Sequence, residues 1–302
     1  MIAKLLKPGD YIGIVAPSNS YKDIFKENFE KARNLLESMR YKLVFGKNLL
    51  ETSEDIAIDA NKRAADINEM FENCEINAII CLQGGENANA VLPLLDYEAI
   101  KENPKIFLGL SDITTILNAI YKKTGLITYH GNDFLFGFGG DFTEYDMNDF
   151  EDTFVKGNRK ELIPTKNRKI VRGGKAEGIL IGGNLRCLLK LAGTEYFPDF
   201  SNAILFVEAQ SGKIKQYEYM FEQLKQIGVF DVINGVIVGY VKGLQEEPKS
   251  KIQMEDILLK VTSNYNFPII KCDDFGHKNS NATMPIGAKV RINTNDCSIK
   301  FI

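Results

Sequence analysis

The first half of the chain alternates short, almost wholly apolar runs with longer segments that have the spacing of an amphipathic helix. The apolar runs occupy residues 11–17, 41–46, 76–82 and 105–110. In segment 22–39 apolar side chains recur at helical spacing, at Phe25, Phe29, Ala32, Leu35 and Leu36. Further helical patterns cover 61–73 and 87–95. Strands that are apolar throughout and alternate with helices are typical of a parallel sheet buried on both faces. We therefore predict an α/β fold.

This pattern divides the chain into two predicted domains. Residues 1–150 form an N-terminal α/β domain with a parallel, flavodoxin- or Rossmann-like sheet, and residues 176–302 form a smaller C-terminal α/β domain that contains a β-sheet. Residues 151–175 are charged and weakly periodic, which indicates a connection that follows a helix. Later strand-like runs cover 176–185, 203–208, 235–241 and 267–271, with helical patterns after the second run and near 252–262. The end of the chain is typical of an antiparallel hairpin that turns at 293–296.

Composition excludes several classes of protein. Of the 302 residues, 44% are hydrophobic and 25% charged, as in ordinary soluble globular proteins. A formal net charge of −3 without a long basic run argues against nucleic acid as the main partner. No run approaches about 18 apolar residues, so we expect no membrane span. The first residues lack the pattern of a signal peptide, and the five cysteines are scattered without a C-x-x-C pair. We expect a cytoplasmic protein with free thiols and no metal.

Two features lie where the carboxyl ends of predicted parallel strands meet, the edge at which such sheets bind ligands. Ser111 follows the run 105–110 and precedes a helix, so its hydroxyl is either a nucleophile or a helix N-cap. Gly84 and Gly85 follow the run 76–82. Two glycines let the backbone approach a ligand closely and direct N–H groups at an oxyanion, or they make a plain turn. No phosphate-binding glycine motif is present.

A serine nucleophile commonly needs an imidazole base that is oriented by a third group. The chain has two histidines, His130 and His277, and spacing alone allows either one to reach Ser111. Glu208 ends the apolar run 203–208, where its carboxylate is placed to orient a histidine. The alternatives are a structural or solvated histidine and a glutamate that forms a salt bridge at a strand end. The residues alone therefore suggest a Ser–His–Glu set without deciding for it.

Seven motifs then occur in order: VAPSN near the start, GGENANAVLPLLDY (84–97), NPKIFLGLSDIT (103–114), YHGNDF (129–134), GILIGGNL (178–185), ILFVE (204–208) and FGHKNSNATMPIG (275–287). From about Ile14 to Ile302 the chain resembles the LD-carboxypeptidase and microcin C immunity family of serine peptidases. The resemblance implies an N-terminal parallel-sheet domain and a C-terminal domain with the site between them. It also implies a homodimer that needs no metal or cofactor.

The resemblance assigns a role to each candidate residue. Ser111 matches the family's nucleophile, Glu208 its acidic triad member and His277 its base. The oxyanion hole then consists of backbone N–H groups of Asp112 and of one glycine in the 84–85 turn, with Gly85 preferred. Position 113 is Ile, so this is not the G-x-S-x-G turn of α/β-hydrolases.

The implied substrate is a small peptide such as murein tetrapeptide, or an aminoacyl-nucleotide such as processed microcin C. Carboxypeptidases of the family often have Arg where this chain has Gln83, and segment 84–97 looks closer to the microcin immunity branch. That branch stacks an aromatic, typically Trp, on the nucleobase, and this chain has no Trp. For substrate binding we consider Gly84, and as cations that read a carboxylate Arg186 and Arg172. The alternative function is a non-catalytic protein that binds a small anion in the interdomain cleft.

Overall fold

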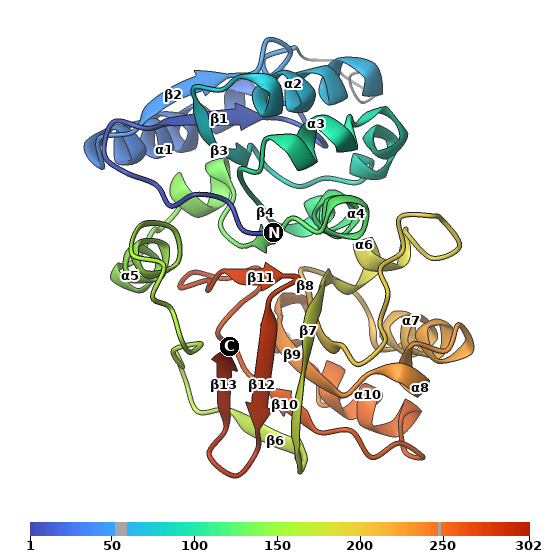
Figure 1. Ribbon diagram of the computed structural model, residues 1–302. Coiled ribbons are helices and arrows are strands. Elements are labelled where there is room, and N and C mark those ends of the chain that lie inside the picture. The colour runs from blue at the N-terminus through green and yellow to red at the C-terminus, as the bar shows by residue number, and fades with distance from the viewer. Residues whose placement is uncertain (52–58, 247–248) are drawn as a thin grey trace.

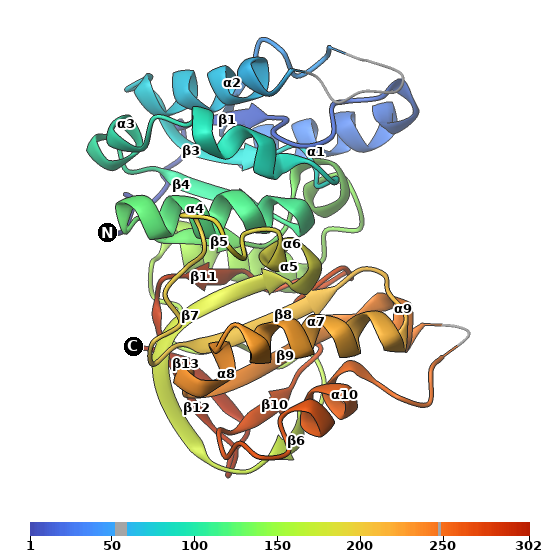
Figure 2. The ribbon, with the colours of Figure 1, turned by 90° about the vertical axis from the view of Figure 1, so that its right-hand side faces the viewer.

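The computed structural model describes residues 1–51, 59–246 and 249–302, and it contains two β-sheets, one above the other in Figure 1. The strand order is β11-β5-β4-β3-β1-β2 in the first sheet and β13-β12-β7-β8-β9-β10-β6 in the second. Figure 2 shows the same two sheets from the side, with helices packed along them. No helix within the described ranges is long and apolar enough to cross a membrane.

The first sheet has the parallel core that the sequence predicts. Its parallel strands are β1 (Tyr11–Val15), β2 (Lys42–Phe45), β3 (Ile76–Cys81), β4 (Ile106–Gly109) and β5 (Thr128–His130). The helices between them are α1 (Lys26–Ser38), α2 (Ala60–Glu72), α3 (Tyr97–Glu102) and α4 (Thr114–Thr124). In Figure 1, α1 lies on one side of the sheet and α2, α3 and α4 lie on the other. The order β2-β1-β3-β4-β5 is that of flavodoxin-like folds, which confirms the predicted class.

One strand of the first sheet comes from the other end of the chain. β11 (Met284–Ile286) pairs antiparallel with β5, with Met284 opposite His130. We expected all of 176–302 to lie in the C-terminal domain. Instead, β11 covers the edge of β5, which would otherwise expose unpaired backbone groups. The strand is only three residues long and has Pro285 at its centre, which is why the sequence pattern did not reveal it.

The second sheet also has a parallel core. Its four central strands are β7 (Lys175–Asn184), β8 (Ile204–Ala209), β9 (Gly235–Val241) and β10 (Ile269–Lys271). The predicted hairpin is confirmed as β12 (Lys289–Asn293) and β13 (Ser298–Phe301). The helices are α6 (Leu185–Leu189), α7 (Ile214–Gln226), α8 (Val229–Val232), α9 (Lys242–Gln245) and α10 (Met254–Val261).

The segment between the two sheets has more regular structure than a connection needs. It starts with α5 (Glu144–Phe150), which continues into a π-helical turn over Glu151–Val155. It then supplies β6 (Lys169–Arg172), which pairs antiparallel with β10 at an edge of the second sheet. The helix expected at 87–95 is a 3₁₀ helix over Ala88–Leu94. Pro93 lies inside that helix and lacks the N–H that a regular α-helix needs.

Helix α4 joins the two sheets close to the expected site. The side-chain amide of Asn118 donates to the carbonyl oxygen of Gly182 at 2.9 Å, and the backbone N–H of Asn184 donates to Thr114 Oγ1 at 3.0 Å. A Cβ on Gly183 would lie 2.6 Å from Thr114 Oγ1, so only glycine permits this approach. The start of α4 is therefore held in register with the end of β7.

Candidate active site

Ser111 lies in a sharp turn between β4 and α4. The turn is a 3₁₀ helix over Ser111–Ile113, and Ser111 has φ +62°. This left-handed conformation is uncommon for a residue with a side chain, and such strain is found at functional sites. The N-cap positions of the turn and of α4 are Leu110 and Ile113, so Ser111 is not itself the N-cap of either helix. Ser111 lines a cavity of about 920 Å³.

Glu208 and His277 form a buried hydrogen-bonded pair beside this cavity. Glu208 is near the end of β8 and is completely buried, and its Oε2 lies 2.5 Å from His277 Nδ1. The amide of Asn184 donates to Glu208 Oε1 at 3.0 Å, so both carboxylate oxygens are bound. His277 lines the same cavity as Ser111. Its Nε2 has no hydrogen-bond partner among the described residues and is therefore available to accept a proton.

The charges of the pair support each other. Burial alone would raise the pKa of Glu208, but the charge and hydrogen bond of His277 lower it below its usual value. Burial likewise would lower the pKa of His277, but the charge and hydrogen bond of Glu208 raise it above the usual 6.5. The pair therefore favours an ionised carboxylate and stabilises an imidazolium when one forms.

His130 also lies next to Glu208, but in a different environment. It ends β5, is completely buried, and its Nε2 lies 3.8 Å from Glu208 Oε1, too far for a hydrogen bond. Burial lowers the pKa of His130 to about 4, so its ring is neutral at physiological pH. Neither of its ring nitrogens has a hydrogen-bond partner in the described part of the chain, and it does not line the cavity.

The paired glycines pack directly against the Ser111 turn. A Cβ on Gly84 would lie 2.6 Å from Ser111 Cβ and 3.3 Å from the backbone nitrogen of Asp112. A Cβ on Gly85 would lie 2.3 Å from Ser18 Oγ. Both glycines and Ser111 line the cavity. At Gly84 the loop after β3 therefore needs glycine for its close approach to the Ser111 turn.

The structure separates the two candidate arginines. Arg186 lines the cavity, and its closest carboxylate, that of Glu86, is 3.8 Å away. Its side chain remains 57% exposed, so the guanidinium is accessible. Arg172 lies on β6, at the far edge of the second sheet, and is not brought to this cavity. Its guanidinium donates to backbone oxygens of Thr262 and Phe267 and packs over the Phe267 ring, which fixes it there.

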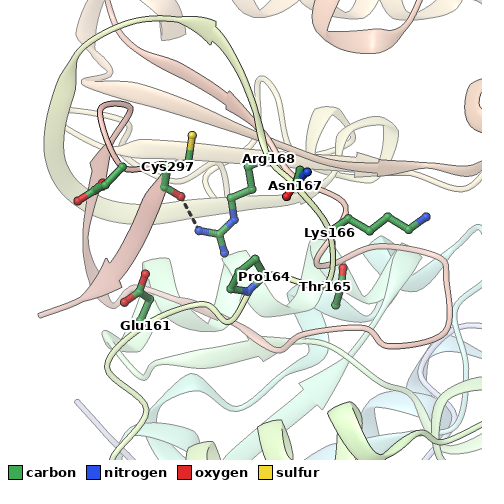
Figure 3. Close-up of a pocket in the computed structure, with 8 residues that line it drawn as sticks. Glu161, Pro164, Thr165, Lys166, Asn167, Arg168 and Cys297 are labelled. Atoms are coloured by element: carbon green, nitrogen blue, oxygen red, sulfur yellow. Dashed lines mark hydrogen bonds between the residues drawn. The ribbon is translucent and has the colours of Figure 1, made fainter.

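A second cavity of about 400 Å³ lies between segment 161–168 and the β12–β13 turn, as Figure 3 shows. Its arginine, Arg168, is fully engaged. The guanidinium binds Asp274 at 2.8 Å, Cys297 O at 2.7 Å and Leu162 O at 2.5 Å. The lining contains no histidine and no free guanidinium. The larger cavity at Ser111 is therefore the candidate active site.

Two residues of this site received no role from the sequence. Asn184 binds Glu208, and it also caps α6, since its Oδ1 accepts from the backbone N–H of Cys187. Its position between a strand and a helix is a recognisable N-cap signal. Asp133 is buried in the cavity wall and accepts the N–H groups of Phe136 and Gly137, while burial raises its pKa to about 6. Nothing in the pattern distinguishes it from the other acidic residues.

The chain is similar to known proteins over both of its halves. Residues 12–131 match the LD-carboxypeptidase N-terminal domain, and residues 177–292 match the LD-carboxypeptidase C-terminal domain. The putative carboxypeptidase YocD of Bacillus subtilis is 32% identical over 97% of this chain and 96% of its own. The probable murein peptide carboxypeptidase of the same organism is 29% identical over 96% and 91%.

Microcin C7 self-immunity protein MccF of Escherichia coli is 31% identical over 100% of this chain and 95% of its own. The wild-type MccF structure without ligand superposes with a TM-score of 0.92, covering 100% of this chain and 98% of that one. A further MccF structure holds aspartyl sulfamoyl adenosine and superposes with a TM-score of 0.91 at 31% identity, covering 100% and 98% of the two chains. On the evidence of both matched domains and of these full-length similarities, the chain belongs to the LD-carboxypeptidase family of serine hydrolases.

Proposed function

We propose that this protein hydrolyses an amide bond in a small peptide or an aminoacyl-nucleotide conjugate by means of Ser111, His277 and Glu208. The main support is the buried Glu208–His277 hydrogen bond of 2.5 Å beside the cavity that Ser111 lines in a strained turn. The family resemblance further supports a homodimer that works in the cytoplasm without a metal or cofactor.

In the proposed reaction, Ser111 Oγ attacks the carbonyl carbon of the amide while His277 Nε2 takes the hydroxyl proton. Glu208 keeps the proton of His277 on Nδ1 and stabilises the imidazolium. The negative charge on the carbonyl oxygen is bound by the N–H groups of Gly85 and Asp112. The intermediate then expels the amine, which receives the proton from His277, and water releases the acyl group by the same steps.

Cavity size and lining favour a small polar substrate. Its volume of about 920 Å³ is near the upper end of the range for small-molecule sites, about 300–1,000 Å³. That volume accommodates a tetrapeptide or an aminoacyl-nucleotide. Arg186, with its exposed guanidinium, supplies a cation that can bind a substrate carboxylate in two hydrogen bonds. The relatives support both substrate kinds, because one is a probable murein peptide carboxypeptidase and MccF binds aspartyl sulfamoyl adenosine.

The test is to incubate the purified protein with murein tetrapeptide and with aspartyl sulfamoyl adenosine, and to quantify both products of each. In parallel, a fluorophosphonate probe should label Ser111, with Ser111→Ala as the control. Turnover of either substrate together with labelling at Ser111 is expected. Binding of these compounds without turnover or labelling would instead support the non-catalytic anion-binding protein.

A further inference from the structure

We propose that Lys190 is a positioning residue that sets the geometry of the oxyanion hole from outside the cavity; this rests on the hydrolytic function proposed above. Lys190 follows α6, in the C-terminal half of the chain. Its ammonium lies 2.5 Å from Asp112 Oδ1 and donates to the backbone carbonyl of Glu86 at 2.6 Å. Asp112 carries one of the two proposed oxyanion amides, and Glu86 directly follows Gly85, which carries the other. Lys190 thereby links the two parts of the proposed oxyanion hole.

The carboxylate of Asp112 extends this connection to two further segments of the N-terminal half. It is completely buried, and its second oxygen, Oδ2, accepts Ser18 Oγ and the N–H of Ala88, both at 2.7 Å. Ser18 belongs to the loop after β1, and Ala88 begins the 3₁₀ helix that follows the loop after β3. One carboxylate therefore holds both segments, and Lys190 holds that carboxylate. A buried carboxylate is costly unless it is paired, so loss of the ammonium removes the partner that fixes Oδ1 and leaves the carboxylate free to shift.

Lys190 acts through these groups and not on the substrate. Ser111 and Glu86 line the cavity, whereas Lys190 does not, and its side chain is 23% exposed. The loops also have support that is independent of Lys190, because Arg63 donates to the backbone oxygens of Pro17 and Asn87. Removal of Lys190 should therefore alter the relative placement of the two amides without unfolding the loops that carry them.

This predicts a specific kinetic result. An oxyanion hole acts mainly on charge that develops in the transition state, so a displaced hole lowers kcat and leaves KM nearly unchanged. Loss of one donor typically costs about 10²- to 10³-fold in kcat, and a displaced donor should cost less. For Lys190→Met we expect kcat to fall about 10- to 100-fold and KM to change less than about threefold.

The matched control is Lys123→Met, which removes another partly exposed lysine that forms an ion pair, with Glu195, and that does not line the cavity. Its kcat should remain at the wild-type value. The melting temperature of each variant is measured as well. A purely structural role of Lys190 would lower the melting temperature but leave kcat of the folded enzyme unchanged, and that result would overturn the proposal. If Lys190→Met does not fold, Lys190→Gln is used, with the same expectation of a lowered kcat at constant KM.

A double variant adds a second readout. Asp112→Asn keeps the backbone N–H but removes the charge that Lys190 binds, so the Asp112→Asn/Lys190→Met variant should be little worse than the more damaged single variant. Additive losses, or a rise in KM at constant kcat, would overturn the proposal. The proposed function fails in a different way, namely when the wild-type protein neither turns over substrate nor reacts with the fluorophosphonate.

Discussion

Gly84→Ala tests the contact between the glycine loop and the nucleophile turn with a single methyl group. The added Cβ would lie 2.6 Å from Ser111 Cβ and 3.1 Å from Ser111 Oγ. Carbon atoms in contact are normally about 3.5–4.0 Å apart, so the loop and the turn must separate by about 1 Å. Gly84 is not in the left-handed region of backbone conformation, so the effect comes from this contact and not from backbone strain.

A displacement of this size at a reacting group lowers the reaction rate strongly. Misplacement by about 1 Å can cost about 10²-fold, which corresponds to about 2.7 kcal/mol of transition-state stabilisation. Overpacking of this kind typically destabilises a fold by about 1–3 kcal/mol. Gly84→Ala should therefore remain folded with a slightly lower melting temperature, while kcat/KM falls about 100-fold. Labelling of Ser111 by fluorophosphonate should slow in parallel.

Gly173→Ala is the matched control. The nearest side-chain atom to its added Cβ is 3.8 Å away, which is an ordinary contact, and Gly173 does not line the cavity. Both variants are compared by kcat/KM on whichever substrate the wild-type protein cleaves, and by thermal melting. If Gly84→Ala keeps kcat/KM within about threefold of wild type, the glycine loop does not constrain Ser111 and the reasoning fails.

Four further results are expected. His277→Ala should lose about 10⁴-fold or more in kcat, whereas His130→Ala should lose much less, and steady-state assays with the reverse order would refute the assignment of the base. Because the pKa of His277 is raised above 6.5 and the base must be neutral, kcat/KM should fall as pH drops through a value above 6.5. Glu208→Gln removes the charge that raises this pKa, so the acid limb of its pH–rate profile should move to lower pH, and an unmoved limb would contradict the pairing. Amidation of the substrate's terminal carboxylate should lower kcat/KM about tenfold or more, because a charge-assisted hydrogen bond contributes about 1.5–3 kcal/mol. Equal turnover of the acid and the amide would exclude carboxylate recognition by Arg186.

The fold class was predictable because its signal is repeated along the chain. The parallel strands β1, β3 and β4 of the first sheet are apolar runs bounded by helix patterns, and burial on both faces makes that pattern strong. Elements that depend on distant partners were missed. β6 (Lys169–Arg172) has two exposed residues and is paired with β10 at the edge of the second sheet. β11 is paired with β5 at the edge of the first sheet.

The candidate site was predictable in its residue types but not in its contacts. Ser111, Gly84 and Glu208 all follow or end apolar strands, a position that sequence periodicity locates well. The choice between His130 and His277 was not available from spacing, since both lie close to Glu208 in the structure. What separates the two rings is burial: His130 is sealed in the core, whereas His277 lines the cavity, and burial of a single ring depends on the packing of both sheets.

The position of His277 shows why the site needs both halves of the chain. Ser111 follows β4 in the first sheet, and Glu208 lies in β8 of the second. The loop that carries His277 leaves the second sheet at β10 and enters the first sheet at β11, so each end of the loop is held by a different sheet. Within the loop, the side chain of Asn281 accepts the N–H of Gly276 at 2.8 Å, which fixes the backbone next to the histidine. A relative movement of the two sheets would therefore shift the two ends of this loop relative to each other, and with them the imidazole. For this reason the strand β11, although it is only three residues long, bears directly on the chemistry proposed for this site.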